Sequence, residues 1–133
     1  MRDGLTEKLK VRPDKSDVKA FFDTYQARVV VLSGRHAGME HQLDSKRVTL
    51  GRGPGVDLAF DDPAMSRQHA AIDFVEGAFR VHDLGSTNGL RVNGSRAQVR
   101  DLVHGDRIEF GTQVFQLVID EREDTPNTYE LTP

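Results

Sequence analysis

The chain has 133 residues, a net charge of −3 and no cysteine. This length suffices for one domain with a hydrophobic core of its own. The lack of cysteine excludes disulfides and thiolate metal sites, and the slightly acidic balance argues against a general nucleic-acid binder. No apolar run is long enough to span a membrane, and residues 1–10 lack the apolar segment of a secretory signal, so we expect a cytoplasmic protein.

Charge is distributed unevenly along the chain. Residues 120–133 contain one arginine and five acidic residues, whereas residues 28–119 contain eleven basic and eleven acidic residues. Ten of these eleven basic residues are arginines, whose planar guanidinium suits the recognition of carboxylate and phosphate groups. A GC-rich genome would also raise the arginine content. We expect flexible tails on both sides of a folded centre. The composition and the lack of cysteine also suit a bacterial protein.

The N-terminal segment predicts a short helix. Residues 1–15 are of mixed charge and poor in apolar residues, and Ser16 is a candidate N-cap. Val18, Phe21, Phe22 and Tyr25 then fall on one helical face. We expect this aromatic face to pack on the same domain or on a second copy of the chain. A docking face for a partner protein is the alternative.

From Ala27 onward the apolar residues follow the two-residue period of strands. Turn residues separate the predicted strands, which recur about every eight to twelve residues and include no helical crossover. The predicted strands are 28–33, 39–43, 47–50, 57–60, 69–75, 78–83, 90–92, 97–99, 106–110 and 113–119. This pattern predicts an all-β fold, an antiparallel β-sandwich or barrel. We therefore divide the chain into an N-terminal tail with a short helix (1–27), a β-domain (28–119) and an acidic C-terminal tail or linker (120–133).

Polar residues and glycines gather in three loops at strand ends. Residues 50–55 are rich in glycine, but their spacing fits neither a dinucleotide fingerprint nor a P-loop, and a strand follows them. Nucleotide binding is therefore disfavoured, which leaves Arg52 projecting from a strand end. In the third loop, residues 85–89, Thr87 and Asn88 present a hydroxyl and a carboxamide that could bind an extended peptide.

The second loop contains Ser66, Arg67 and His69. A serine nucleophile with a histidine base is one interpretation, but Ser66 is not on a strand-to-helix elbow. A metal site of His69 with His82 or Asp83 would lack the tight spacing of known metal motifs. We expect no catalytic residue and no metal here.

These loops, placed on a β-sandwich, resemble the forkhead-associated (FHA) domain family. The resemblance covers residues 28–119. The matching motifs are Gly51-Arg52, Ser66-Arg67-x-His69, Gly85-Ser86-Thr87-Asn88-Gly89, Val92-Asn93-Gly94, Leu102-x-x-Gly105-Asp106 and a closing strand with Phe115. The resemblance implies an eleven-stranded sandwich that binds phosphothreonine peptides through loops at one end.

The resemblance also implies roles for five contact residues. Arg52 and Ser66 would hold the phosphate oxygens, and Arg67 would add charge to the same pocket. Thr87 would reach the phosphate or the peptide. Asn88 would hold the main chain of the ligand next to the phosphothreonine.

Other motif positions would serve the scaffold. Gly51, His69, Gly85 and Gly89 are expected to be structural. Ala64 would face the third residue after the phosphothreonine, and its small apolar side chain hints at a preference that is not ionic.

The implied partner is a protein or peptide whose threonine a Ser/Thr kinase has phosphorylated, with no cofactor, nucleic acid or membrane involved. Phosphorylated threonines of the chain itself could also enter the pocket of the same or another copy. The candidates are Thr6, Thr24, Thr125, Thr128 and Thr132. Two alternatives stay open: a phosphate-independent interaction module that uses a sheet face or the aromatic helix, and an esterase-like site on Ser66 and His69.

Overall fold

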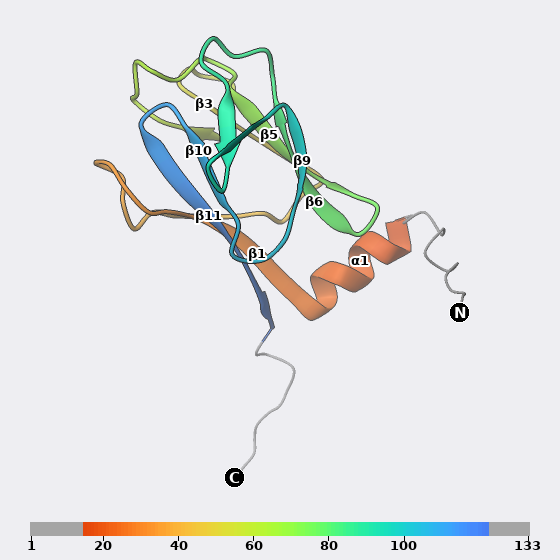
Figure 1. Ribbon diagram of the computed structural model, residues 1–133. Coiled ribbons are helices and arrows are strands. Elements are labelled where there is room, and N and C mark those ends of the chain that lie inside the picture. The colour runs from red at the N-terminus through yellow and green to blue at the C-terminus, as the bar shows by residue number, and fades with distance from the viewer. Residues whose placement is uncertain (1–14, 123–133) are drawn as a thin grey trace.

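The structure is a computed structural model that describes residues 15–122, with side chains from Lys19 onward. Two β-sheets pack face to face, and a short helix, α1 (Lys15–Thr24), covers one end (Figure 1). The strands are β1 (Tyr25–Val31), β2 (Glu40–Gln42), β3 (Arg47–Gly51), β4 (Leu58–Ala59), β5 (Ala70–Val75), β6 (Ala78–Asp83), β7 (Leu90–Val92), β8 (Ser95–Ala97), β9 (Val99–Leu102), β10 (Arg107–Phe110) and β11 (Gln113–Glu121).

The predicted all-β sandwich is confirmed. One sheet has the order β2-β1-β11-β10-β7-β8 and the other has the order β4-β3-β5-β6-β9. Neighbouring strands are antiparallel except β3 and β4, which run parallel. Strand β1 begins at Tyr25 and β11 ends at Glu121, so strands extend beyond both ends of the predicted domain 28–119. The division of the chain into tails and domain stays a prediction.

The structure corrects the prediction at three places. Residues 97–99 do not form one strand, because the chain passes at Gln98 from β8 in one sheet to β9 in the other. The carbonyl of Gln98 accepts a hydrogen bond from the Asp83 amide at 2.8 Å, which holds this crossing. Helix α1 begins at Lys15, so Ser16 lies inside the helix instead of capping it, and Tyr25 already belongs to β1.

Two tight turns set the register of the hairpins. Asn93 and Gly94 join β7 to β8 and have φ angles of 51° and 88°. Glu76 and Gly77 join β5 to β6 with φ angles of 53° and 82°. Two consecutive residues with positive φ match the right-handed twist of the flanking strands, and asparagine and glycine adopt this conformation at little cost. The Asn-Gly hairpin predicted from the sequence is therefore confirmed.

The core lies between the two sheets. Strand β1 shows the expected alternation, with Ala27, Val29 and Val31 buried and the residues between them partly exposed. The same pattern in β6 buries Phe79 and Val81. Burial of this apolar surface is the main force that stabilises the sandwich.

The helix packs on the domain itself. The ring of Phe21 lies 4.8 Å from that of Phe74, and the ring of Phe22 lies 5.2 Å from that of Phe74. The Arg122 amide donates to the Thr24 carbonyl at 2.9 Å, so the end of β11 is fastened to the end of α1. The prediction that the aromatic face packs on this domain is confirmed, and this packing leaves only part of the face exposed for docking a partner.

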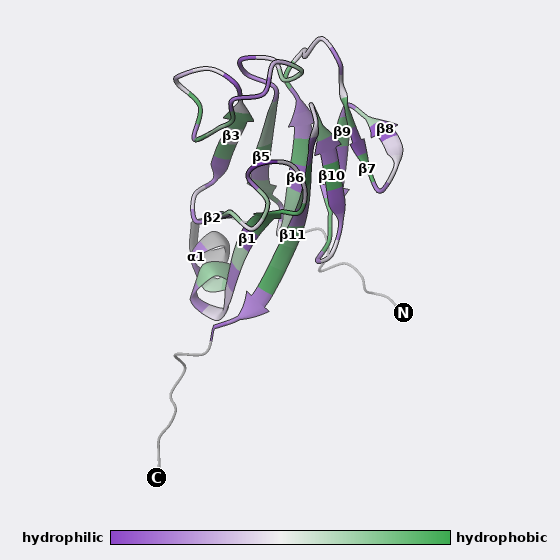
Figure 2. Cartoon of the chain, turned by 90° about the vertical axis from the view of Figure 1, so that its left-hand side faces the viewer, coloured by the Kyte–Doolittle hydropathy of each residue, from purple (hydrophilic) through white to green (hydrophobic). Residues whose placement is uncertain are grey.

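The helix and the end of β11 lie at the opposite end of the sandwich from the loops that follow β3 and β6 (Figures 1 and 2). Those loops carry the motifs singled out from the sequence. Between Lys15 and Arg122, no helix is long and apolar enough to cross a membrane.

Candidate functional site

Backbone hydrogen bonds join the loop after β3 to the loop before β5. The Arg52 amide donates to the Ser66 carbonyl at 3.0 Å, and the His69 amide donates to the Leu50 carbonyl at 2.9 Å. The chains run so close that a Cβ atom on Gly51 would lie 2.0 Å from the carbonyl oxygen of Arg67. Only glycine fits here, because any side chain would push the Ser66–Arg67 backbone away from Arg52.

The structure brings the five predicted contact residues together. They line one hollow of about 380 Å³, called here the loop hollow. Its lining residues are Arg52, Pro63, Ala64, Met65, Ser66, Arg67, Thr87 and Asn88. The side chains come from three loops that are distant in the sequence and adjacent in space. Their roles toward a ligand stay predictions.

Arg52 and Ser66 present unused donors to the loop hollow. The Nε of Arg52 donates to the Met65 carbonyl at 3.0 Å, which fixes the side chain, and neither Nη group binds a residue between Lys15 and Arg122. The hydroxyl oxygen of Ser66 accepts the Thr87 amide at 3.0 Å, so its own hydrogen is available to a ligand. Both groups are thus arranged to donate hydrogen bonds, which favours an anion with acceptor oxygens.

Arg67 and Asn88 complete the loop hollow. The stem of Arg67 lies over Gly53, where a Cβ atom would be 3.1 Å from Cγ. The guanidinium of Arg67 forms no ion pair with another described residue. Asn88 donates from Nδ2 to the Ala64 carbonyl at 3.0 Å, which ties the third loop to the second. Its Oδ1 makes no hydrogen bond to a described residue and can accept one from a peptide N–H.

His69 supports the site from the core. Its ring is fully buried and stacks on Phe110 at 4.6 Å. Nδ1 accepts the Ser66 amide at 3.0 Å and Nε2 donates to the Gly89 carbonyl at 2.8 Å, so one neutral ring links the second and third loops. Both nitrogens are occupied by backbone groups. The histidine therefore contacts the Ser66 amide and not its hydroxyl, which is the wrong arrangement for a serine nucleophile and its base.

The third loop also stabilises itself. Ser86 donates its hydroxyl to Asp83 and accepts the Gly89 amide at 2.8 Å. Gly85 and Gly89 have φ angles of 78° and 76°, a conformation that residues with a side chain seldom adopt. These bonds hold Thr87 and Asn88 at the tip of the loop.

A buried carboxylate anchors the second loop to the turn after β10. Asp62 accepts the amide and the hydroxyl of Thr112, both at 2.8 Å, and the Ala64 amide at 3.0 Å. Burial by itself would raise the pKa of Asp62, but these hydrogen bonds to its charged form outweigh burial and lower the pKa below its ordinary value. Sequence analysis missed this anchor, since Asp61-Asp62-Pro63 is an ordinary turn sequence.

We expect Asp62→Asn to reduce the free energy of unfolding by about 1–2 kcal/mol at pH 6. Because the folded state lowers the pKa of Asp62, its contribution is present above the unfolded pKa of about 3.9 and is lost as pH falls below it. The difference in free energy of unfolding between the wild type and Asp62→Asn should therefore narrow below about pH 4. Urea unfolding at several pH values measures this difference, and the titration of the other carboxylates, which both proteins share, cancels from it. A gap that stays constant down to pH 2 would contradict this role.

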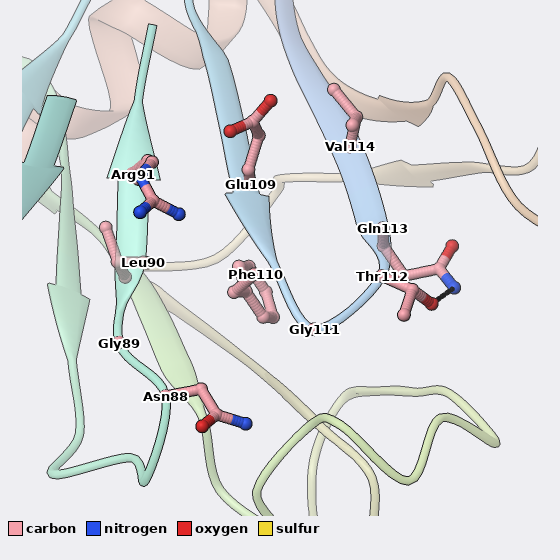
Figure 3. Close-up of a pocket in the computed structure, with 10 residues that line it drawn as sticks. All are labelled: Asn88, Gly89, Leu90, Arg91, Glu109, Phe110, Gly111, Thr112, Gln113 and Val114. Carbon is pink, nitrogen blue, oxygen red and sulfur yellow. Dashed lines mark hydrogen bonds between the residues drawn. The ribbon is translucent and has the colours of Figure 1, made fainter. Parts of the chain in front are cut away.

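A second hollow, called here the sheet hollow, begins at Asn88 and follows β7, β10 and the start of β11 (Figure 3). Its volume is about 350 Å³. Arg91 and Glu109, on neighbouring strands, line it together with Thr112 and Gln113. Asn88 therefore stands between the loop hollow and the sheet hollow.

The candidate metal ligands do not come together. His69 lies in the core. His82, on β6, instead contacts Asp73 of the neighbouring strand β5 at 2.9 Å, and both side chains are partly exposed. Between Lys15 and Arg122, no three histidine, aspartate or glutamate side chains are grouped to hold a metal ion.

Known proteins share the region that carries the three loops. The family model of the FHA domain matches residues 48–111, a range that contains all of them. The solved FHA domain of the CT664 protein from Chlamydia trachomatis is 32% identical, with a TM-score of 0.65, and the match covers 70% of this chain and 96% of that one. The chain belongs to the FHA domain family. The predicted family and its type of sandwich are thus confirmed.

Another FHA domain and a bacterial inhibitor protein are similar to this chain. A domain solved in a structural and functional analysis of phosphothreonine-dependent FHA domain interactions is 28% identical, has a TM-score of 0.65 and matches over 70% of this chain and 95% of its own. The oxoglutarate dehydrogenase inhibitor of Corynebacterium efficiens is 41% identical over 92 residues, or 69% of this chain. That match spans 63% of the inhibitor, less than two thirds of its length.

Proposed function

We propose that this FHA domain binds partner proteins through a phosphorylated threonine held in the loop hollow. The observation that carries the proposal is the convergence of Arg52, Ser66, Arg67, Thr87 and Asn88 on one hollow, where Arg52 and Ser66 have donors that no other described residue uses. The phosphothreonine-dependent interactions of the similar FHA domain support the same ligand. A phosphothreonine carries a charge of about −1.5 to −2 and three acceptor oxygens, which match these donors.

In this proposal each side chain has the role in ligand binding that the family resemblance implies. Arg52 and Ser66 bind the phosphate oxygens, and Arg67 adds a second guanidinium. Thr87 contacts the phosphate or the peptide, and Asn88 binds the peptide main chain through Oδ1. Each charge-assisted hydrogen bond contributes about 1.5–3 kcal/mol, so two or three of them separate phosphorylated from unmodified threonine by several kcal/mol.

We further propose that the domain acts as a signalling regulator and not as an enzyme. One relative is an inhibitor of oxoglutarate dehydrogenase, which supports a regulatory role exerted by binding. The occupied ring nitrogens of His69 argue in the same direction, because they leave Ser66 without a base. A Ser/Thr kinase must produce the ligand from ATP, so we place the interaction in the cytoplasm. No cofactor or metal is needed for it.

The test is direct binding of matched peptides. We expect the protein to bind members of a phosphothreonine peptide library and to bind the same peptides without phosphate at least about 100-fold more weakly. Fluorescence anisotropy measures both series, and phosphatase treatment of a bound partner provides the control. Binding that survives the phosphatase would contradict the proposal and favour a phosphate-independent module.

The fold limits how the chain could bind its own phosphorylated threonines. Thr24 is the last residue of α1, where its hydroxyl donates to the Ala20 carbonyl at 3.2 Å, and the other four candidates lie outside the described residues. Strand β11 alone spans about 27 Å between Arg122 and the loops. The chain from Arg122 reaches at most about 11 Å at Thr125 and about 22 Å at Thr128. Binding through either of these threonines would therefore join two copies.

A further inference from the structure

The end of the domain that carries the loops has more arginines than the proposed phosphate site contains. Four arginines form no ion pair with another described residue and line the hollows around residues 87–89. Arg52 and Arg67 line the loop hollow, and Arg91 lines the sheet hollow. Arg96 lines a third hollow of about 280 Å³, called here the edge hollow. The sequence motifs single out neither Arg91 nor Arg96.

The edge hollow adjoins the loop hollow. Thr87 lines both, and Ser86 and Gly89 of the same loop also line the edge hollow. A phosphothreonine bound in the loop hollow has neighbouring residues within about 3.5–7 Å along the peptide. A side chain of such a neighbour is thus close enough to enter the edge hollow.

The guanidinium of Arg96 lies against this loop. A Cβ atom on Gly89 would be 2.7 Å from Nη2 of Arg96, so the side chain folds over the loop backbone. The glycine at position 89 therefore provides both the positive φ of the loop and the space that Arg96 occupies. Asp83 lines the same hollow, but it accepts the Ser86 hydroxyl and forms no ion pair with Arg96. The donors of Arg96 are therefore not used by any residue that the structure describes.

The strand pairing places two like charges side by side. Arg96 lies directly opposite Arg91 across β7 and β8, and Arg91 is in turn opposite Glu109 across β7 and β10. Like charges that face each other across strands repel. Glu109, Arg91 and Arg96 thus form a row across β10, β7 and β8, in which Glu109 adjoins Arg91 (Figure 3). Arg96 lies at the outer end of this row, on the edge strand β8, and has no acidic neighbour in it. An anion at Arg96 would relieve the repulsion.

From these contacts we propose that Arg96 binds a second anionic group of the phosphopeptide, on a residue close to the phosphothreonine. The inference rests on the proposed function of the loop hollow and adds a determinant of ligand specificity to it. The anion is the carboxylate of an aspartate or glutamate, or the phosphate of a second phosphorylated residue. Both share the acceptor oxygens that a guanidinium binds.

The test compares peptides that differ only in this second charge. A phosphothreonine peptide with otherwise neutral residues is the reference, and glutamate is moved through the three positions on either side. We expect at least one glutamate peptide to bind the wild type about 5-fold more tightly than the reference. A second phosphothreonine at that position replaces the glutamate in a parallel arm, and the larger gain identifies the preferred anion.

Two variants assign the gain to Arg96. In Arg96→Gln the reference peptide should bind as it does to the wild type, and the gain from glutamate should disappear. Arg107→Gln removes the same charge at the far end of β10 and should keep the gain. A gain that persists in Arg96→Gln, or the absence of a gain at every position, would overturn the inference while leaving the proposed function intact. Failure of the wild type to bind the reference peptide would instead overturn the proposed function.

Discussion

Replacing Arg52 by alanine is expected to weaken the binding of phosphothreonine peptides by about 100-fold or more while the domain stays folded. The substitution removes the two Nη groups of a side chain that lines the loop hollow, and with them at least two of the proposed charge-assisted hydrogen bonds to the phosphate. The side chain is exposed and makes one hydrogen bond to a described residue, at the Met65 carbonyl. The cost to the free energy of unfolding should therefore stay below about 1 kcal/mol.

Two further variants separate charge from geometry. Arg107→Ala removes an exposed arginine far from the loops and should bind like the wild type. Arg52→Lys keeps the charge but loses the planar fork, so its affinity should fall between those of the wild type and Arg52→Ala. Titration of one labelled phosphopeptide against all four proteins, together with their thermal unfolding, gives the comparison. Equal affinity of Arg52→Ala and the wild type would refute the assignment of Arg52.

The sequence was sufficient to predict the parts of the fold that follow from local rules. The two-residue period of β1 and β6 gives their buried residues directly, and the Asn93-Gly94 pair gives a hairpin turn. The passage from one sheet to the other at Gln98 was missed. It occurs within a short polar stretch, and it depends on pairings with other segments, since β8 pairs with β7 in one sheet and β9 pairs with β6 in the other.

The candidate site could be predicted in its motifs but not in its supports. Arg52, Ser66 and Asn88 belong to short patterns of residue types, which a sequence reveals. Asp62 holds the second loop through Thr112, fifty positions later in the chain. No local sequence pattern around either residue predicts this contact. Arg96 was missed for a related reason, since its place beside Gly89 depends on how β8 folds back on β7.

Replacing His69 by alanine is expected to cost about 3–4 kcal/mol of the free energy of unfolding. The fully buried ring would leave a cavity beside Phe110, and the Ser66 amide and the Gly89 carbonyl would lose their partners. Peptide binding should weaken as well, because this ring helps to join the loop of Ser66 to the loop of Thr87 and Asn88. Chemical denaturation measures the first effect and phosphopeptide titration the second.

His82→Ala is the matched control for His69→Ala. His82 is a partly exposed histidine whose ring contacts Asp73 on a sheet surface, and its removal should cost no more than about 1 kcal/mol and leave binding unchanged. The two histidines differ in burial and in what their nitrogens bind. If His69→Ala were as stable as His82→Ala, the ring would not be an important link between the two loops, and the placement of Ser66 would depend on its hydrogen bonds to Arg52 and Thr87.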